Sequence, residues 1–591
     1  MGSKRKKQKA ARDTSGQPTR QSTGASTVAA APVEVAPHRD AIESIIIAIV
    51  LALLFRTFEA EAFVIPTGSM APTLLGRNKE MRCDACNYLF AIGANEDSEL
   101  RLGQPVVSIT CPLCRHVTPI DPKNSAQDSF GGDRILVNKF AYQFGEPQRW
   151  DVIVFKNPSN AKQNYIKRLI GLPNETVRIQ SGDIFTKSGD EPFRIARKPP
   201  EKIRRLLRLV HDTDHIPVEM LEDDWPLPWQ NAATNSGPWQ ISKDRQQYDL
   251  DSSAETAWLF YAHVPPDDWH TGNEMRTSTP RPQLITDILG YNTAAYAGQP
   301  GRAYVDGNHW VGDLALNASV QVKSSSGTIH MRLIEGGRAF DCTIDVANGQ
   351  ATLKVPDDTP FEGNGGTELT ASTRVRKPGR YDLTLSNIDD QLLLWINRDL
   401  VVFQTAAGQN HDGAYQGIAQ VSPAWTPDEP GDLHPARIGG TNIEMQVARL
   451  RVARDIYYIA VDGQANSRDE YDMQFLMSQA NVASLPNSYR VFQEPDSWAT
   501  TSLFASRRTV EKELGEDQFF PLGDNSAMSK DARLWHGREP SVFDEKGYIV
   551  VPHWVERERL IGKAFVVYWP HGWKVGNVPI VPNVRRMGRI R

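Results

Sequence analysis

Residues 165–173 read Tyr-Ile-Lys-Arg-Leu-Ile-Gly-Leu-Pro and are expected to form a β-strand. Successive side chains of a strand point to opposite faces, so Lys167 and Arg168 would lie on opposite faces. If one face is buried, one cation is buried with it. A desolvated lysine loses its charge and becomes a base, whereas an arginine keeps its charge. Periodicity does not decide which cation is buried, and a strand with one snorkelling cation is the simpler alternative.

Other segments of the chain read as strands too. Two of them, residues 132–139 (GDRILVNK) and 151–156 (DVIVFK), precede residues 165–173 in the chain. Between residues 301 and 460, apolar residues alternate in short runs that are separated by turn residues; they begin at Leu314, Ile329, Ala351, Tyr381, Leu392 and Val447. Short strands at such spacing predict a mainly β protein that includes an antiparallel sandwich of the jelly-roll kind.

Length and composition limit the class of protein. A chain of 591 residues corresponds to about four domains at ~150 residues each. Its 66 Lys and Arg against 71 Asp and Glu give a net charge of −5, too mild for a nucleic-acid binder. Hydrophobic residues make up 40% and aromatic residues 9%, enough for real cores, and five cysteines exclude a disulfide-built scaffold.

The chain begins with a basic segment that leads to an apolar run. Six of the first twelve residues are Lys or Arg, and residues 1–40 are expected to form a disordered cytoplasmic arm. Residues 45–55 are uncharged and apolar, and the run extends to residues 42–58 if Arg56 snorkels toward the headgroups. We therefore expect a single transmembrane helix at residues 41–58.

Two alternatives to a retained anchor remain for this run. It has the length of the apolar part of a cleavable signal peptide, and residues 60–62 (Ala-Glu-Ala) resemble a cleavage site. The long segment before it and the missing small-residue bend before Arg56 argue against cleavage. A buried core helix is the third interpretation. A retained anchor in the inner, or cell, membrane would leave the N-terminus in the cytoplasm and the catalytic domain on the outer, periplasmic side.

Four cysteines form two CxxC pairs; they are Cys83, Cys86, Cys111 and Cys114. Each short turn brings two sulfurs within reach of one tetrahedral ion, and β-like stretches at residues 88–90 and 106–109 could form the ribbon. The pattern predicts a zinc ribbon over residues 81–119, although the 24 residues between the pairs slightly exceed the usual spacing. Disulfides are the alternative in an oxidising compartment. Closed four-thiolate coordination would make such a zinc structural and not catalytic.

Residues 62–74 (AFVIPTGSMAPTL) contain a candidate nucleophile. Ser69 follows Gly68 and lies between Pro66 and Pro72, which indicates a rigid turn. The surrounding residues carry neither a GxSxG elbow nor an SxxK signature. Clusters of Pro, Gly and Ser are usually ordinary turns, so this pattern alone does not establish catalysis.

The order of these segments resembles that of bacterial type I signal peptidases, the membrane-bound serine proteases also called leader peptidases. After the apolar run come PTGSMAPTL, GDRILVNK, DVIVF, YIKRLIGLP and GDNSAMSKDAR, the last within residues 521–533. The likeness covers about 200 residues, and its five segments occur in the same order. It implies a Ser–Lys dyad in which Ser69 is the nucleophile and Lys167 the general base. It also places the hydroxyl of Thr67 and the backbone N–H of Ser69 in the oxyanion hole.

The resemblance implies further roles. The serine that hydrogen-bonds the lysine and the Asp–Arg pair that braces the site match Ser529, Asp531 and Arg533. The positions that line two small substrate pockets match Phe63, Ile65, Met70, Leu74, Tyr165 and Ile166. The family has a mostly antiparallel β-domain on the membrane surface and cleaves secretory precursors after small residues at −1 and −3. Expected partners are thus secretory precursors and membrane lipid, with no nucleic acid and no cofactor for catalysis.

The chain departs from the family at two turns. Trp150 stands where a glycine usually precedes the aspartate of DVIVF, so that turn is expected to differ. Asn174 replaces the second glycine of GLPGD. Asparagine tolerates the left-handed conformation better than other non-glycine residues, so the second turn is expected to survive.

A large insertion divides the peptidase-like core. The expected parts are the first part of the core at residues 59–195, a Trp- and Pro-rich connection at 196–300, a sandwich similar to laminin-G or concanavalin-like domains at 301–460, and the second part of the core at 500–591. Tryptophans of the connection could stack on sugars, but buried packing is their commoner role.

Two rival functions follow from the insertion. The sandwich could be an envelope carbohydrate or protein binder on a degenerate peptidase, although intact Ser69, Lys167 and Ser529 argue against that. In the other rival, the insertion selects a subset of precursors for a specialised protease.

Overall fold

The computed structural model describes most of the chain in two compact units, Met1–Arg56 and Thr57–Arg591. The described residues are 37–54, 60–94, 104–124, 129–217, 220, 225–231, 237–266, 280–297, 307–363, 366–418, 421–463, 470–472, 491–492, 494–498, 502–535, 537–539, 549–570, 572–575 and 578–590. The predicted disordered arm, except for its last residues, lies outside these ranges.

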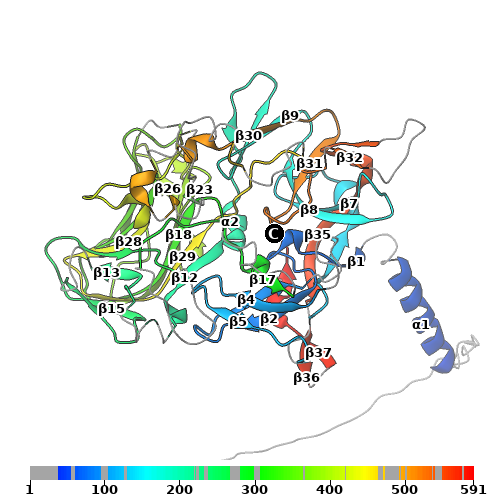
Figure 1. The fold of residues 1–591 in the computed structure, drawn as a ribbon, viewed down its shortest axis with the longest axis horizontal. Helices are drawn as coiled ribbons and strands as arrows, with labels where there is room; N and C mark the ends of the chain where they lie inside the picture. The colour runs from blue at the N-terminus through cyan, green and yellow to red at the C-terminus, as the bar shows by residue number, and fades with distance from the viewer. Residues whose placement is uncertain are drawn as a thin grey trace, which may run out of the picture. The chain divides into compact units, whose positions relative to one another are not determined.

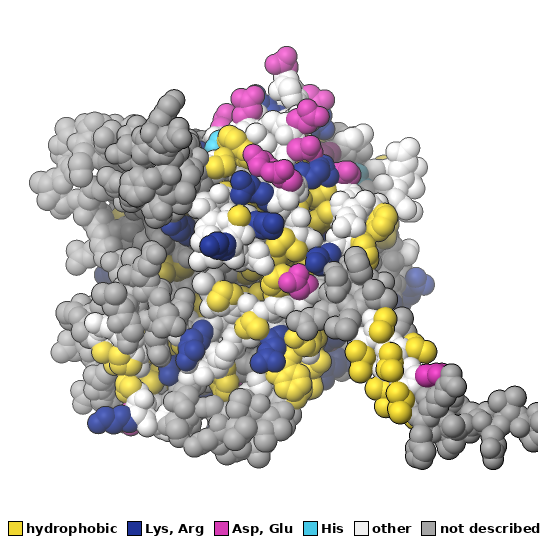
Figure 2. Space-filling view, turned by 90° about the vertical axis from the view of Figure 1, so that its right-hand side faces the viewer, with side chains coloured by type: hydrophobic (Ala, Val, Ile, Leu, Met, Phe, Trp, Pro, Cys, Tyr) yellow, Lys and Arg dark blue, Asp and Glu magenta, His cyan; other side chains and the backbone are white. Residues whose placement is uncertain are grey.

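Helix α1 (Pro37–Leu54) is the described part of the first unit. Ile45, Ile46 and Ile47 are each more than half exposed, and hydrophobic side chains cover the visible side of this helix (Figure 2). Among the described helices, however, none combines the length and the apolar character that a membrane span requires. The predicted transmembrane helix at residues 41–58 is therefore not supported, because the first two turns of α1 contain charged residues and residues 55–58 lie outside the description.

The second unit contains a mixed-order sheet that joins segments from both ends of the chain (Figure 1). Its strands, in spatial order, are β1 (Ala60–Val64), β6 (Arg134–Asn138), β35 (Leu560–Trp569), β7 (Val152–Lys156), β8 (Asn164–Gly171), β31 (Gln518–Leu522) and β34 (Val555–Glu556), and β38 (Gly588–Arg589) pairs with β35. All of these pairings are antiparallel. Strand β35 lies between β6 and β7, so the predicted second part of the core completes the sheet of the first.

A second sheet packs beside the first and shares its apolar core. It consists of β11 (Arg194–Ile195), β10 (Asp183–Ser188), β9 (Glu175–Gln180) and β30 (Thr509–Glu513). Ser181 and Gly182 both have positive φ, the geometry of a tight hairpin turn between β9 and β10. Both faces of β7 and β8 are buried, which explains their nearly continuous apolar sequences.

The insertion forms two large antiparallel sheets. One contains β14 (Trp239–Ile241), β15 (Gln247–Leu250), β29 (Met445–Arg454), β18 (Leu314–Val322), β23 (Gly379–Ile388), β24 (Gln391–Ile396) and β25 (Asp399–Leu400), with β12 (Arg208–Asp212) also on β29. The other contains β13 (Trp229–Asn231), β16 (Ala257–Tyr261), β28 (Ala436–Thr441), β19 (Thr328–Glu335), β20 (Arg338–Asp345), β21 (Gln350–Lys354), β22 (Glu368–Ser372), β26 (Phe403–Gln404) and β27 (Asn410–His411).

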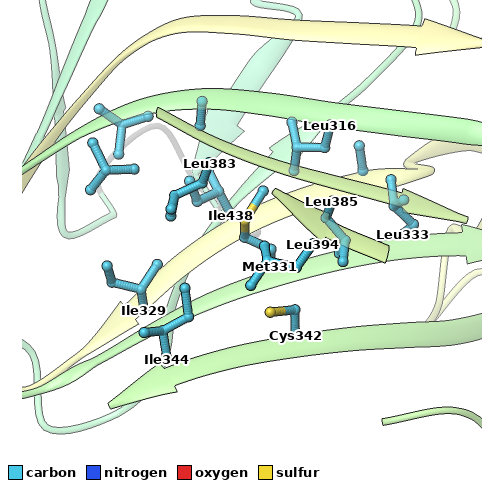
Figure 3. Close-up of a cluster of buried hydrophobic side chains, with 14 of the residues drawn as sticks. Leu316, Ile329, Met331, Leu333, Cys342, Ile344, Leu383, Leu385, Leu394 and Ile438 are labelled. Atoms are coloured by element: carbon cyan, nitrogen blue, oxygen red, sulfur yellow. The ribbon is translucent and has the colours of Figure 1, made fainter. Parts of the chain in front are cut away.

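Side chains from both of these sheets meet in one buried core (Figure 3). Leu316 and Leu385 come from the first sheet, and Met331 and Ile438 come from the second; all four are at most 1% exposed. The alternating runs of the sequence thus mark strands whose apolar faces pack on each other, as predicted for a sandwich. Cys342 is fully buried in this core, and burial raises the pKa of its thiol.

The two sheets extend beyond the range expected for the sandwich. Strands β12 to β16, from residues 208–261, pair with its strands, so much of the expected connecting region belongs to these sheets. Trp229 and Trp239 are buried, and the Nε1 of Trp239 donates to the Ala257 carbonyl at 3.1 Å. These tryptophans therefore serve the core and do not offer a sugar-stacking surface; Trp269 lies outside the described residues.

The remaining described elements are small. They are helix α2 (Pro200–Leu206), the hairpin β2 (Asn78–Arg82) and β3 (Leu89–Gly93), the sheet of β17 (Ala294–Tyr296), β4 (Val106–Thr110) and β5 (Val117–Pro119), and the hairpins β32 (Gly537–Glu539) with β33 (Ile549–Val551) and β36 (Gly572–Val575) with β37 (Val578–Pro582). Strand β17 comes from the insertion, so the insertion extends this cysteine-bearing sheet.

Candidate active site

Ser69 lies on a short 3-10 helix, η2 (Gly68–Met70), that follows β1. Thr67 is its N-cap residue; it is exposed, and its side chain makes no capping hydrogen bond. The first N–H groups of a helix have no acceptor within the helix. The backbone N–H of Ser69 is such a group, and Ser69 itself is 9% exposed.

Strand β8 brings Lys167 to this turn. The Nζ atom of Lys167 lies 2.7 Å from the Oγ atom of Ser69, although the two residues are 98 positions apart in sequence. Strands β7 and β31 flank β8, so the lysine projects from the middle of a sheet and not from a loop. The structure therefore brings together the two residues that the sequence singled out for catalysis.

The surroundings of Lys167 favour its neutral form. The residue is 4% exposed and makes no ion pair with any described residue. Burial lowers its pKa from 10.5 to about 8, while the nearby carboxylates of Asp531 and Asp524 act in the opposite direction and Arg533 reinforces the decrease. An amine with this pKa is partly deprotonated near neutral pH and can accept a proton.

The neighbouring cation, Arg168, is buried as well, which differs from the expectation of a single buried cation. Its guanidinium donates to both carboxylate oxygens of Asp524 at 2.7 Å, and neither side chain is exposed. Thr73 donates to the same carboxylate at 2.5 Å. Both faces of β8 are covered, so the strand buries two cations: Arg168 is paired with a carboxylate, whereas desolvation lowers the pKa of Lys167 to about 8.

Ser529 lies close to the nucleophile but makes no hydrogen bond with a described residue. A Cβ atom added to Gly523 would lie 2.2 Å from Ser529 Oγ and 2.4 Å from the Ser69 carbonyl oxygen. Ser529 and the backbone of Ser69 thus both lie against the Cα hydrogen side of this glycine that a Cβ would occupy. The hydrogen bond between Ser529 and Lys167 that the family resemblance implies is not formed here and stays a prediction.

Asp531 and Arg533 form the pair that the resemblance implies. The Nε and Nη2 atoms of Arg533 donate to the two Asp531 oxygens at 2.9 and 2.8 Å, and neither residue is exposed. Asp531 also accepts from the Gly523 N–H at 2.9 Å. The Arg533 guanidinium holds the pKa of Asp531 below its usual value. The pair therefore fixes the loop that contacts Ser69.

Most of the predicted substrate-pocket residues gather in one apolar cluster. The cluster contains Phe63, Ile65, Met70, Leu74 and Ile166. Tyr165 differs: it packs in the neighbouring cluster, with its ring edge-on to Phe155 at 6.3 Å between centroids. Met70 and Leu74 are fully buried, so their contact with a substrate stays a prediction.

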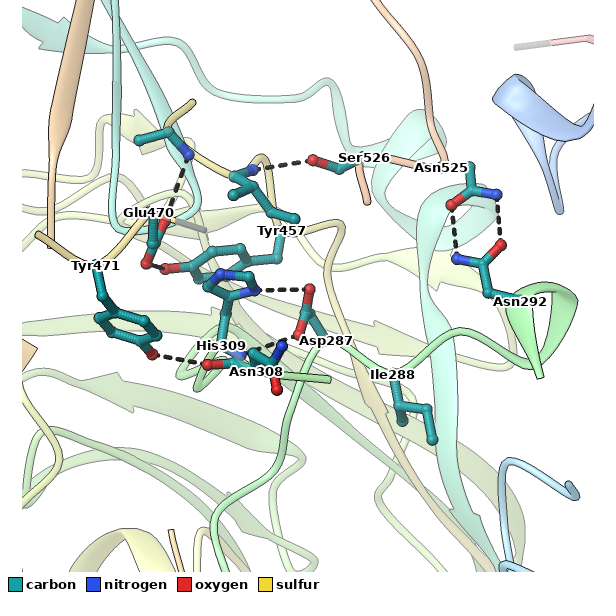
Figure 4. A network of polar contacts seen from close by, with 12 residues as sticks. Asp287, Ile288, Asn292, Asn308, His309, Tyr457, Glu470, Tyr471, Asn525 and Ser526 are labelled. Carbon is teal, nitrogen blue, oxygen red and sulfur yellow. Dashed lines mark hydrogen bonds and ion pairs between the residues drawn. The ribbon is translucent and has the colours of Figure 1, made fainter. Parts of the chain in front are cut away.

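A polar network that was not predicted joins the insertion to the site through Asn292 and Asn525, whose amides face each other (Figure 4). The side-chain N–H of Asn525 donates to the Gly68 carbonyl at 3.1 Å, and its backbone N–H donates to the Ser69 carbonyl at 3.1 Å. Asn292 of the insertion pairs with the Asn525 amide. Asp524 and Asn525 belong to the GDNS segment, whose resemblance to the family could have indicated them. No sequence pattern indicated Asn292.

The two turns that depart from the family pattern both keep a left-handed residue. Asn174 has φ of 61°, as expected. Trp150 has φ of 71°, so a tryptophan holds a backbone conformation that suits glycine. Its indole is buried, and its Nε1 donates to the Arg197 carbonyl at 3.1 Å. These contacts offset the conformational cost of about 1–2 kcal/mol.

The four cysteines of the CxxC pairs also come together. Their sulfurs lie within 4.8 Å of one another, with 3.6 Å between Cys83 and Cys114 and between Cys86 and Cys111. None of the four is in a disulfide. A tetrahedron of sulfurs around zinc, with bonds of about 2.3 Å, has edges of about 3.8 Å, so the donor set fits such an ion.

Comparison with known proteins indicates a peptidase, as the contact between Ser69 and Lys167 does. Residues 106–214 match the family described as "Signal peptidase, peptidase S26"; this range includes Lys167 but not Ser69. The chain is 29% identical over 192 residues to signal peptidase I of Leptolyngbya laminosa, covering 31% of this chain and 67% of that protein. It is 52% identical over 59 residues to signal peptidase I of Pseudomonas aeruginosa, covering 8% of this chain and 21% of that protein.

A third relative, "Signal peptidase I P" of Bacillus subtilis subsp. natto, is 25% identical over 206 residues, covering 35% of this chain and 69% of that protein. The chain thus spans about two thirds of the length of two of these relatives and a fifth of the third.

The solved structures that resemble the chain are β proteins with low overall similarity. A galectin of Caenorhabditis elegans, LEC-6, has a TM-score of 0.17 and 9% identity, covering 24% of this chain and 83% of its own. The carbohydrate-binding module CBM66 of Bacillus subtilis has a TM-score of 0.18 and 9% identity, covering 39% and 92%. Scores this low do not define a shared fold.

The matched segment and the relatives place the chain in the class of serine peptidases, hydrolases that cleave peptide bonds. Within that class, it is similar to type I signal peptidases.

Proposed function

We propose that the chain removes signal peptides from secretory precursors, with Ser69 as nucleophile and Lys167 as general base. The observation that carries this proposal is the 2.7 Å contact between Lys167 Nζ and Ser69 Oγ, made by a buried lysine without an ion-pair partner among the described residues. The neutral amine takes the hydroxyl proton as Ser69 Oγ attacks the scissile carbonyl. As the scissile C–N bond breaks, the Lys167 ammonium gives this proton to the leaving amine, which leaves an acyl-enzyme and a neutral Lys167. Water then hydrolyses the acyl-enzyme with the same amine as base.

The turn around Ser69 supplies candidates for stabilising the developing oxyanion. The Ser69 N–H begins a helical turn, and the Thr67 hydroxyl is exposed beside it and makes no capping bond. Each oxyanion-hole donor contributes about 3–4 kcal/mol to transition-state stabilisation. The apolar cluster that includes Ile65 and Ile166 lies next to the dyad, which favours substrates with small apolar residues before the scissile bond.

Cleavage of a precursor with a small–X–small site tests the proposal. Wild type is compared with Ser69→Ala and Lys167→Met, and Ser386→Ala is the matched control, because Ser386 is a buried serine of the sandwich whose Oγ lacks a described partner. We expect cleavage by wild type and the control and none by the two dyad variants with their folds intact. Cleavage by Ser69→Ala at the wild-type rate would refute the dyad. No cleavage by wild type would favour the rival carbohydrate- or protein-binding function.

We further propose that the protein acts at a cell membrane, with its basic arm in the cytoplasm and its catalytic unit outside. Ile46 and Ile49 of α1 are each 54% exposed, and helices that expose such side chains usually contact apolar partners or lipid. Replacing Ile46 and Ile49 together by Asp should release the full-length protein from membranes in a sedimentation assay. Unchanged sedimentation would contradict the proposal.

The four-cysteine cluster is proposed to hold a structural zinc ion. Its sulfur spacing fits tetrahedral coordination, and the hairpin β2–β3 and the pair β4–β5 each supply one CxxC turn. Metal analysis should find about one zinc per chain and a loss of zinc in Cys86→Ser, with Cys342→Ser as the control. Four oxidised thiols without zinc would refute this site. The laminin-G likeness of the sandwich likewise stays a proposal that rests on its alternating strands.

A further inference from the structure

A loop of the insertion lies directly against the turn that carries Ser69. It is the 3-10 helix η6 (Gly290–Asn292), which precedes strand β17. A Cβ atom added to Gly68 would lie 2.0 Å from Cε1 of Tyr291, so the tyrosine ring covers the residue before Ser69. The Tyr291 hydroxyl donates to the Arg77 carbonyl at 2.9 Å. The insertion therefore packs on the nucleophile turn itself.

A reciprocal amide pair continues this contact into hydrogen bonds (Figure 4). Asn292 Nδ2 donates to Asn525 Oδ1 at 2.9 Å, and Asn525 Nδ2 donates to Asn292 Oδ1 at 2.8 Å. The same Nδ2 of Asn525 donates to the Gly68 carbonyl at 3.1 Å. A side-chain amide has two donors and two acceptor lone pairs, and Asn292 determines how the Asn525 amide is turned. The Gly68 carbonyl is thus held by a group whose orientation the insertion sets.

The loop that carries Asn292 is fastened at its base. Asp287 accepts from the His309 N–H at 3.0 Å, and its other oxygen lies 3.0 Å from His309 Nδ1. Arg454, at the end of β29 of the sandwich, donates to the Ile288 carbonyl at 2.7 Å. The loop is consequently tied to the sandwich on one side and to the nucleophile turn on the other.

We propose that Asn292 is a positioning residue for the peptidase reaction and that it acts through Asn525. Asn525 donates hydrogen bonds to two consecutive backbone carbonyls, those of Gly68 and Ser69. Loss of Asn292 frees the Asn525 amide to rotate and releases the Gly68 carbonyl. The Ser69 N–H belongs to the same peptide unit as that carbonyl, so its direction changes too. The inference rests on the proposed role of Ser69 as nucleophile.

Kinetics of the full-length protein test the proposal. The variants are Asn292→Ala, Asn525→Ala and the double variant, with Asn348→Ala as the control, because Asn348 is an exposed amide in a sandwich turn. We expect kcat to fall by about 10- to 100-fold in Asn292→Ala with KM within twofold, since small misplacements of a reacting group have effects of this size. The double variant should lose no more than Asn525→Ala alone, because both act through one bond network.

Hydrogen exchange gives a readout that does not need turnover. Peptides that cover residues 64–74 should exchange faster in Asn292→Ala than in wild type and Asn348→Ala. Wild-type kcat in Asn292→Ala, or additive losses in the double variant, would overturn the proposal while Ser69→Ala remains inactive and the proposed function stands. The proposal would also be overturned if Asn292→Ala lowered the melting temperature and changed KM and kcat together, because lower stability would then explain the loss of activity. Full activity of Ser69→Ala would overturn both.

Discussion

The pH dependence of cleavage follows from the burial of Lys167. The amine acts as a base only when it is neutral, and burial lowers its pKa to about 8. Because the neutral form increases as pH rises through this pKa, kcat/KM should rise between pH 7 and 9 and then level off. If Lys167 acted as an acid with the same pKa, kcat/KM would instead fall as pH rises.

The size of the rise distinguishes a perturbed lysine from an ordinary one. With a pKa of about 8, roughly one tenth of the lysine is neutral at pH 7 and roughly nine tenths at pH 9, a gain of about tenfold. With the ordinary value of 10.5 the gain would be about 100-fold and would continue to pH 10. In Asp531→Asn the plateau should begin at lower pH, because the Asp531 carboxylate raises the pKa of Lys167.

The assay measures cleavage of a fluorogenic peptide with a small–X–small site from pH 6 to 10.5 at constant ionic strength. Ser69→Ala provides the background at each pH, and circular dichroism shows that the fold persists. A rate that climbs with unit slope beyond pH 10, or one that is flat from pH 6 to 9, would refute the argument. So would a plateau that moves to higher pH in Asp531→Asn.

Three further predictions concern the support of the site and the independence of the sandwich. Asp524→Asn leaves the buried Arg168 charge unpaired and should lower the free energy of unfolding by about 3–5 kcal/mol in urea titrations; a change below 1 kcal/mol would contradict this. Gly523→Ala places a Cβ 2.2 Å from Ser529 Oγ and should reduce kcat by at least about tenfold with the fold retained, whereas wild-type kcat would show that the loop adapts freely. Leu385→Ala should cost about 2–5 kcal/mol of stability by opening a cavity in the sandwich, yet leave kcat unchanged at a temperature where the chain is folded; a parallel loss of kcat would mean that sandwich packing reaches the site.

Local patterns were enough to predict much of the fold. The alternation in residues 314–322 reflects a strand, because a period of two is a property of the backbone; residues 165–171 also form a strand, although both of its faces are buried. The left-handed turn at Asn174 was predictable for the same kind of reason, since only a few residue types tolerate that conformation. The tryptophan-rich segment misled, because short strands such as β13 and β14 have too few residues to show a period.

The sequence by itself determined the candidate residues: Ser69 on its turn, Lys167 in its strand and the four cysteines in their spacing. It could not determine the pKa of Lys167, because that pKa depends on which side chains cover both faces of β8 and on which of its two cations pairs with Asp524. Nor could it connect Asn292 with Ser69, since residues more than 200 positions apart meet only when the chain packs. Strand periodicity is a local property of the backbone. The burial of Lys167, the pairing of Arg168 with Asp524 and the orientation of the Asn525 amide arise from long-range contacts, which form only in the tertiary structure.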